Sequence, residues 1–160
     1  MEHIIIDTRE KPQAIVLIKK YFDAHGIKYE SKKLDFGDYM AGEHGSISID
    51  RKQSIDELAK NCAAEHDRFK QELERARNAG ATLYLLVEQN SYTFRGEHVR
   101  VHEPIDLLRW QSKYSVLPGE RIYRVLSAWQ RKFGLKIVFC SKRSTGLKIT
   151  QILFGDNNEG

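Results

Sequence analysis

Three short apolar runs constrain the fold of this chain more than any other feature. They are HIIID at residues 3–7, TLYLLVE at residues 82–88 and KIVFC at residues 136–140. Apolar runs of this length, bounded by charged or polar residues, are typical of buried β-strands. Helical patterns fill much of the remaining chain, at residues 13–25, 54–64, 65–80, 121–134 and 144–154. This mixture predicts an α/β fold in which helices flank a central mixed β-sheet.

Capping residues mark several of the predicted boundaries. Pro12 suits the first turn of a helix, and Gly26 suits the end of the same helix. Ser54 is followed three residues later by Glu57, which is the sequence signature of a capping box. Residues 27–34 alternate and predict a further strand.

The length of 160 residues indicates a single domain. We expect this domain to span residues 1–155 and to be followed by a flexible tail at residues 156–160. Residues 89–134 hold both tryptophans and predict a largely helical segment, of which about 89–120 is an elaboration of the core.

Composition excludes several classes of protein. Two cysteines are too few for a disulfide framework or a four-cysteine zinc site. No apolar run approaches the roughly 18 residues that span a bilayer, and the N-terminus lacks the pattern of a signal peptide. The net charge of +4 permits a nucleic-acid partner without requiring one. We therefore expect a cytoplasmic protein with no membrane partner and no small-molecule cofactor.

The polar stretch GDYMAGEHGSISIDRKQSID, at residues 37–56, predicts a hairpin that leads into a helix. A turn centred on His44 places Asp38 directly opposite Asp50. Opposed residues have β-carbons about 4.5–5.5 Å apart, and two carboxylates at that separation repel each other unless a cation lies between them. Oxygen ligands on a rigid frame suit Mg²⁺ or Mn²⁺.

Strand alternation places Lys52 on the same face as Asp50 and sends the Arg51 side chain to the other face. The Arg51 carbonyl is an alternative metal contact. An ammonium beside a metal-bound water stabilises an anionic transition state, which suits phosphodiester hydrolysis. Spacing alone leaves a metal site and an ordinary solvated hairpin both open.

A second acidic cluster, DTRE, follows the first predicted strand. Asp7 lies at the carboxyl end of that strand, where α/β sites gather, so Asp7 and Glu10 could add oxygen ligands. Asp56 falls in the first turn of the next helix. It could hold Lys52 or Arg51, or simply favour the helix dipole.

Several motifs in one order resemble those of the XPF-type structure-specific endonucleases. The motifs are IIIDTRE, GDY…IDRKQSID, HDRFKQELERA…LYLLVE and FCSKRSTGLKITQIL, and they cover much of residues 3–88 and 121–154. The resemblance implies a restriction-endonuclease-like core that cleaves DNA near branches, flaps or junctions with Mg²⁺ or Mn²⁺. It also implies a homodimer, whose interface we expect on the last strand and helices.

The resemblance assigns roles residue by residue. The expected catalytic residues are Asp7, Glu10, Asp38, Asp50 and Lys52, of which Asp7, Asp38 and Asp50 would bind the metal. Arg51 and Asp56 are expected to support the site. The expected DNA-binding residues are Arg9, Arg68, Gln71, Lys142 and Arg143.

Two features depart from the family pattern. Asp50 stands where the family usually has Glu, so the carboxylate loses a methylene of reach. The family also usually adds a tandem helix-hairpin-helix domain, for which this chain has no room. We therefore expect branch specificity to come from this domain, a partner or a dimer, in a protein of bacterial or phage type.

Basic and aromatic residues interleave within the elaboration. They are Arg95, Arg100, Arg109 and Lys113, beside Tyr92, Phe94, Trp110 and Tyr114. Such a group can grip a nucleic-acid backbone and stack on exposed bases, although each aromatic taken singly is more readily explained as core or cover. Of the histidines, His66 is the one to test. The alternative functions are a non-catalytic DNA-binding or scaffolding subunit, and a restriction- or resolvase-type nuclease on the same core.

Overall fold

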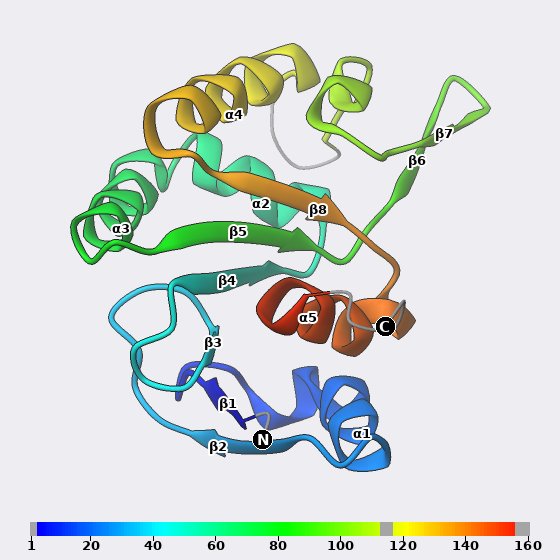
Figure 1. Cartoon of the computed structure of the whole chain (residues 1–160). Coiled ribbons are helices and arrows are strands. Elements are labelled where there is room, and N and C mark those ends of the chain that lie inside the picture. The colour runs from blue at the N-terminus through cyan, green and yellow to red at the C-terminus, as the bar shows by residue number, and fades with distance from the viewer. Residues whose placement is uncertain (1–2, 113–116, 156–160) are drawn as a thin grey trace.

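A six-stranded mixed sheet forms the centre of the computed structural model, which describes residues 3–112 and 117–155 (Figure 1). The strand order is β2-β1-β3-β4-β5-β8. The strands are β1 His3–Ile6, β2 Lys28–Ser31, β3 Tyr39–Ala41, β4 Ile47–Lys52, β5 Thr82–Val87 and β8 Lys136–Phe139. β3 runs antiparallel to β1 and β4, whereas the other neighbouring strands pair in parallel. The predicted α/β class is confirmed.

Helices cover both faces of this sheet (Figure 1). One face packs against α1 Val16–Ala24 and α5 Thr145–Phe154, and the other against α2 Ile55–Cys62, α3 His66–Asn78 and α4 Gly119–Phe133. Short 3-10 helices form at Pro12–Ala14, Pro104–Leu107 and Lys142–Ser144. None of the helices in the described ranges is long and apolar enough to cross a membrane.

Residues in β1 and β4 alternate between the two cores. Ile4 and Ile6 pack with the α1 and α5 side, and Ile5 packs with the α2, α3 and α4 side. Ile49 belongs to the α1 and α5 core, so its neighbour Asp50 projects toward α2 and α3. Alternation therefore separates an apolar face of β4 from a charged one.

The predicted cap of α2 forms with one change. The Ser54 side chain accepts a hydrogen bond from the Glu57 N–H at 3.1 Å. The Glu57 carboxylate accepts from the Gln53 N–H at 3.1 Å, one residue earlier than a capping box requires. Both hydrogen bonds fix the turn that carries the chain from Lys52 into α2.

Ser54→Ala is expected to lower the free energy of unfolding by about 1 kcal/mol, because the Glu57 N–H loses its acceptor. Urea unfolding followed by circular dichroism measures this loss. Ser31→Ala, at an exposed position at the end of β2, is the matched control. Equal losses in the two variants would contradict a capping role for Ser54.

The prediction of a largely helical segment at residues 89–134 is wrong for its first part. Residues 91–100 form a second, two-stranded sheet from β6 Ser91–Phe94 and β7 Glu97–Arg100, which projects from the body (Figure 1). Arg95 and Gly96 have φ values of 50° and 83°, as the tight turn between the strands requires. Helix α4 and the 3-10 turn at Pro104–Leu107 do form. Lys113, Tyr114 and the expected tail at 156–160 lie outside the described residues.

Candidate active site

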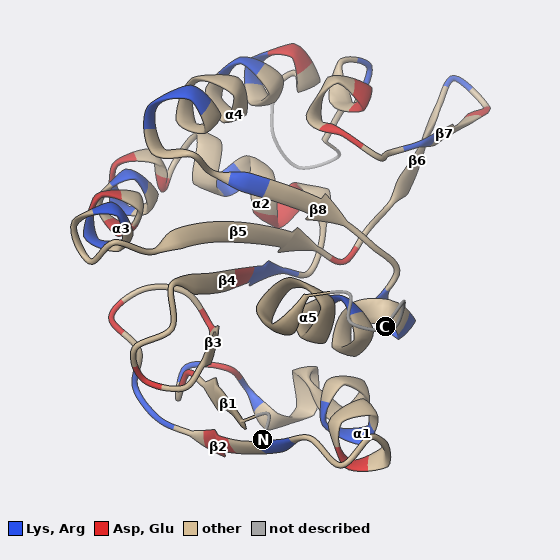
Figure 2. Cartoon of the chain, viewed as in Figure 1, with Lys and Arg blue, Asp and Glu red and all other residues tan. Residues whose placement is uncertain are grey.

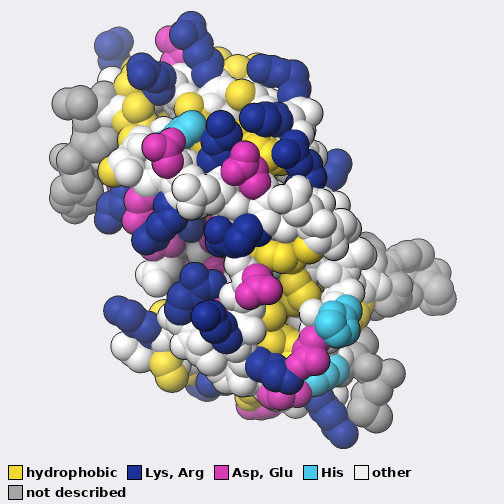
Figure 3. Space-filling model, turned by 90° about the vertical axis from the view of Figure 1, so that its left-hand side faces the viewer, with side chains coloured by type: hydrophobic (Ala, Val, Ile, Leu, Met, Phe, Trp, Pro, Cys, Tyr) yellow, Lys and Arg dark blue, Asp and Glu magenta, His cyan; other side chains and the backbone are white. Residues whose placement is uncertain are grey.

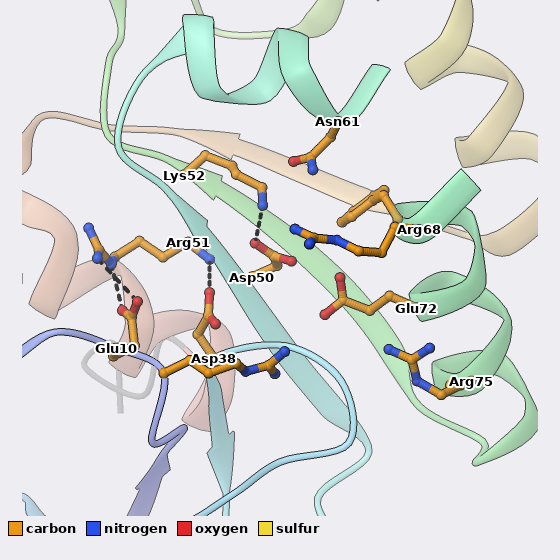
Figure 4. A pocket seen from close by; sticks show the side chains of 11 residues that line it. Glu10, Asp38, Asp50, Arg51, Lys52, Asn61, Arg68, Glu72 and Arg75 are labelled. Carbon is orange, nitrogen blue, oxygen red and sulfur yellow. Dashed lines mark hydrogen bonds and ion pairs between the residues drawn. The ribbon is translucent and has the colours of Figure 1, made fainter. Parts of the chain in front are cut away.

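A cavity of about 360 Å³ opens where β1 and β4 end and α3 passes over the sheet. Its walls carry both acidic and basic side chains (Figure 4). The residues are Arg9, Glu10, Asp38, Asp50, Arg51, Lys52, Asn61, Arg68, Phe69, Glu72 and Arg75. Acidic and basic residues also adjoin each other at the end of β4 in Figure 2.

The β3–β4 hairpin has the register that the sequence predicts. Tyr39 pairs with Ile49 and Met40 with Ser48, so one further step places Asp38 opposite Asp50. The Asp38 N–H donates to the Ile49 carbonyl at 2.6 Å. Gly37, just before Asp38, has a φ of 74°, and a β-carbon there would lie 1.9 Å from the Ser48 hydroxyl oxygen. Only glycine fits this close approach, which locks the register.

Asp38 is a half-buried carboxyl beside other acids. Burial, followed by the charges of Asp50 and Glu10, raises its pKa well above the usual value. The Arg51 N–H donates to its Oδ2 at 2.8 Å and partly opposes that rise. A cation in the cavity would relieve the same repulsion.

Lys52 projects from the same face of β4 as Asp50, as predicted. Its Nζ lies 2.8 Å from the Asp50 Oδ1 and 5.6 Å from the centre of the Phe69 ring. Burial acts to lower the pKa of Lys52, but the charge and hydrogen bond of Asp50 outweigh it and the pKa is raised. Lys52 therefore stays an ammonium at neutral pH.

Glu72, which was not among the residues expected from the sequence, lines the cavity from α3. Its Oε2 accepts from the Gly37 N–H at 2.6 Å, and its carboxyl lies near that of Asp50. Burial, and then Asp50, raise the pKa of Glu72 to about 8. The spacing of Arg68, Glu72 and Arg75, at i, i+4 and i+7 on one face of α3, could have identified it. The expected Gln71 is exposed and does not line the cavity.

Arg51 sends its side chain to the opposite face of β4, as predicted, where two acids bind it. Its Nε and NH2 donate to Glu10 at 2.6 and 3.2 Å, and its NH1 donates to Glu88 at 2.7 Å. Tyr39 also donates to Glu10, at 2.7 Å, and Thr145 donates to Glu88, at 2.5 Å. Glu10 thus lies at the cavity with its carboxylate already paired.

Asp7 does not join the acids of the cavity. Its Oδ1 accepts from the Leu34 N–H at 2.7 Å, and its Oδ2 accepts from the Arg9 backbone and side chain at 3.1 and 2.5 Å. Asp7 is also absent from the cavity walls. The expected trio of Asp7, Asp38 and Asp50 is therefore not assembled. No three His, Cys, Asp or Glu side chains within residues 3–112 and 117–155 are already arranged to hold a metal.

Asp56 lies on a different surface. Its Oδ1 accepts from the Ser112 hydroxyl at 2.5 Å, and it lines a separate cavity beside Ser54 and Glu57. The ion pairs of Lys52 and Arg51 are made with Asp50, Glu10 and Glu88 instead. Within the described ranges, no hydrogen bond or ion pair joins Asp56 to Lys52 or Arg51.

The side chains present nonetheless suit a hard divalent cation. Asp38, Asp50 and Glu72 offer carboxylate oxygens, which Mg²⁺ and Mn²⁺ prefer. Asn61 adds a buried amide oxygen to the same wall, and this Oδ1 has no hydrogen-bond partner in the described part of the chain. The structure therefore fits a metal through Asp38, Asp50 and Glu72 better than through Asp7.

Basic side chains surround this acidic interior. Arg9, Arg68 and Arg75 line the cavity. Figure 3, which views the molecule from the left of Figure 1, shows Lys and Arg side chains on both sides of a hollow, with acidic side chains between them. Lys142 and Arg143 are exposed elsewhere, and Lys142 lines a cavity beside α1. His66 packs on Trp129, with ring centres 5.0 Å apart, and lies outside the site.

Two aromatics of the elaboration are core residues, since Tyr92 and Trp110 are buried. Phe94 is half-buried on the projecting hairpin. Arg95 and Arg109 lie over its ring at 5.0 and 5.7 Å. The base-stacking hypothesis is therefore restricted, among the described residues, to Phe94.

Comparisons with known proteins bear on the fold and the family of the chain. No curated protein matches the chain. XPF from Aeropyrum pernix in complex with DNA has a similar fold, with a TM-score of 0.65 at 18% identity, covering 95% of this chain and 63% of that one. A second structure of XPF from Aeropyrum pernix gives 0.63 at 18% identity, with 94% and 62% covered. The chain thus spans less than two thirds of the length of XPF.

These structural matches confirm the restriction-endonuclease-like core. The sequence pattern of the ERCC4 domain matches residues 6–153, which is most of the chain and includes every acid of the cavity. The chain therefore belongs to the ERCC4 domain family of nuclease domains.

Proposed function

We propose that the chain is a divalent-metal-dependent DNA endonuclease that hydrolyses phosphodiester bonds. The observation that carries the proposal is the cavity in which Asp38, Asp50 and Lys52 meet on one side of the β3–β4 hairpin. Membership of the ERCC4 domain family supports the same conclusion. Mg²⁺ and Mn²⁺ are the cations that the oxygen donors favour.

Some residues of the site would stabilise charge during hydrolysis, and others would hold the catalytic side chains in position. A divalent cation bound at the carboxylates would supply a hydroxide-like water and neutralise charge on the phosphate. The Lys52 ammonium lies beside the acids, where it can stabilise the extra negative charge of the phosphorane-like transition state. Arg51 holds the back of β4 to Glu10 and Glu88, which keeps Asp50 and Lys52 in place from behind.

Arg68 and Arg75 suit the phosphates that flank the scissile bond. Both project from α3 over the cavity and both are exposed (Figure 4). XPF from Aeropyrum pernix, which has a similar fold, was solved in a complex with DNA, and this supports DNA as the substrate. The family resemblance extends the proposal to branched, flap or junction DNA.

Arg68→Ala and Arg75→Ala are each expected to flatten the salt dependence of DNA binding. Each substitution removes one phosphate contact, so the slope of log K against log salt falls by about 1. Fluorescence anisotropy at several salt concentrations measures the slope. Lys20→Ala, at an exposed position on α1, is expected to leave it unchanged. An unchanged slope in both arginine variants would contradict DNA contact at this rim.

Cleavage of a DNA panel tests the proposed activity. The chain is incubated with Mn²⁺ or Mg²⁺ and single-stranded, duplex, flap, fork and four-way DNAs, beside Asp38→Asn. Cleavage of a branched DNA by the wild type alone is the expected result. Tight binding without cleavage under either metal would favour a scaffolding subunit, and equal cleavage by Asp38→Asn would overturn the site.

We also propose a homodimer, as the family resemblance implies. β8 forms one edge of the sheet and α5 follows it in the chain, and we place the interface on these elements. Sedimentation equilibrium with and without DNA tests it, and a monomer under both conditions would overturn it.

A further inference from the structure

Glu72 reaches from α3 to the two strands that carry the acids. Its Oε2 accepts from the Gly37 N–H at 2.6 Å, next to Asp38 in the chain. Its carboxyl also points toward that of Asp50 (Figure 4), and Asp50 raises its pKa. One side chain therefore bridges the helix, the entry to β3 and the middle of the site.

A purely structural role does not explain an acid at this position. A glutamine would accept the same hydrogen bond from Gly37 and could donate to Asp50. A second acid instead adds repulsion beside Asp50, and burying it opposes its charged form, as its raised pKa reports. The charged form of Glu72 is therefore unfavourable in the protein without a ligand. A carboxylate at such a position is expected where the protein binds a positively charged ligand.

Asn61 gives an independent indication of a ligand in the same cavity. Its Nδ2 donates to the Glu65 carboxylate at 3.3 Å, which leaves Oδ1 facing the cavity (Figure 4). The residue is 4% exposed, and this oxygen has no partner within residues 3–112 and 117–155. A buried carbonyl oxygen without a hydrogen-bond partner is unfavourable. A hydrated divalent cation would account for both observations. Its charge would offset the repulsion between the carboxylates of Glu72 and Asp50, and a water molecule bound to it would donate a hydrogen bond to the Asn61 Oδ1.

We propose that Glu72, and not Asp7, is the third carboxylate that binds the divalent cation with Asp38 and Asp50, and that Asn61 accepts a hydrogen bond from water on that cation. The inference rests on the proposed function. Asp50 has a short side chain on a rigid strand, and Glu72 compensates for it with a longer side chain from the facing helix. In the structure Asp50 pairs with Lys52, and Glu72 accepts a hydrogen bond from Gly37. These contacts have to be replaced by contacts with the cation when it binds.

Binding of Mn²⁺ to the full chain without DNA tests the inference. Isothermal titration calorimetry compares the wild type with Glu72→Gln, Asp7→Asn and Glu74→Gln, the last being a control on the same helix and outside the cavity. We expect Glu72→Gln to raise the Kd for Mn²⁺ by about tenfold or more, and the other two to change it by less than about twofold. Thermal unfolding checks each fold, and Glu72→Gln should unfold no earlier than the wild type because glutamine keeps the acceptor for Gly37.

Two outcomes separate this inference from the proposed function. Loss of Mn²⁺ binding in Asp38→Asn and Asp7→Asn, with wild-type binding in Glu72→Gln, would overturn the role of Glu72 and leave a metal-dependent nuclease in place. Absence of Mn²⁺ binding by the wild type itself would overturn the metal dependence on which both depend.

A double variant tests the compensation directly. Asp50→Glu restores a longer carboxylate on β4, so adding it to Glu72→Gln is expected to recover most of the lost Mn²⁺ affinity. A double variant that binds no more tightly than Glu72→Gln alone would overturn the claim that Glu72 makes up for the short Asp50.

Discussion

Lys52→Met is expected to slow cleavage in single-turnover reactions by about 10²–10³-fold. Removing one group that stabilises an anionic transition state typically has an effect of this size. Methionine keeps the stem that packs near Phe69 and removes only the charge. The Kd for DNA should change little, since Lys52 is half-buried and paired with Asp50 while exposed arginines lie at the rim. The two quantities are measured by rapid quench and by fluorescence anisotropy.

Lys20→Met serves as the control for Lys52→Met. Lys20 is exposed on α1, on the opposite side of the sheet, so its loss removes the same formal charge away from the site. A similar small loss of rate in both variants would show that Lys52 contributes only to net charge. A large rise in the Kd of Lys52→Met would instead assign it to DNA binding.

Arg51→Met is expected to lower the free energy of unfolding by about 3–5 kcal/mol, because it leaves two acids buried without their partner. The Arg51 side chain is 4% exposed, and those of Glu10 and Glu88 are 10% and 5% exposed. Burial acts to lower the pKa of Arg51, but its bonds and attraction to Glu10 outweigh this, so the guanidinium stays charged. Urea unfolding measures the loss.

Arg124→Met is the matched control, since Arg124 forms an exposed ion pair with Glu120 within α4. Such a pair contributes about 0.5 kcal/mol or less. Adding Glu10→Gln and Glu88→Gln to Arg51→Met should recover part of the loss, because no buried charge then lacks a partner. Equal destabilisation of the Arg51 and Arg124 variants would contradict a buried network.

The hairpin could be predicted from the sequence because its determinants are local. Two glycines fix a turn near His44, and alternation then decides which side chains share a face. Asp38, Asp50 and Lys52 lie where that argument places them. The opposite direction of Arg51 follows from the same period of two.

The sequence could not predict that the Asp7 side chain is held outside the cavity, because its hydrogen-bond partner is distant in sequence. The Leu34 N–H that takes up its Oδ1 comes from the loop after β2, 27 residues later. Glu72 was within reach of sequence reasoning, since it lies beside the buried Leu73 and one turn after Arg68. The choice of Gln71 followed a family motif, whereas the helical period favours Glu72.

The β6–β7 hairpin was missed for a different reason. Its turn uses Arg95 and Gly96, and arginine rarely adopts the positive φ that the first turn position requires. The common Asn-Gly signal for such a turn is therefore missing from the sequence. The favourable contact of Arg95 with the Phe94 ring helps to hold the turn.

The tripeptide Asp50-Arg51-Lys52 serves two roles, because alternate residues of a strand point to opposite faces of the sheet. Its outer residues face the cavity, while Arg51 ties the strand to Glu10 and Glu88 behind it. A slip of β4 by one residue against its neighbours would exchange the two faces of the strand, so Asp50 and Lys52 would leave their places beside Asp38 and Glu72. Gly37, where a β-carbon would lie 1.9 Å from the Ser48 hydroxyl oxygen, favours the observed register, and so a residue that does not line the cavity helps to decide which side chains enter it.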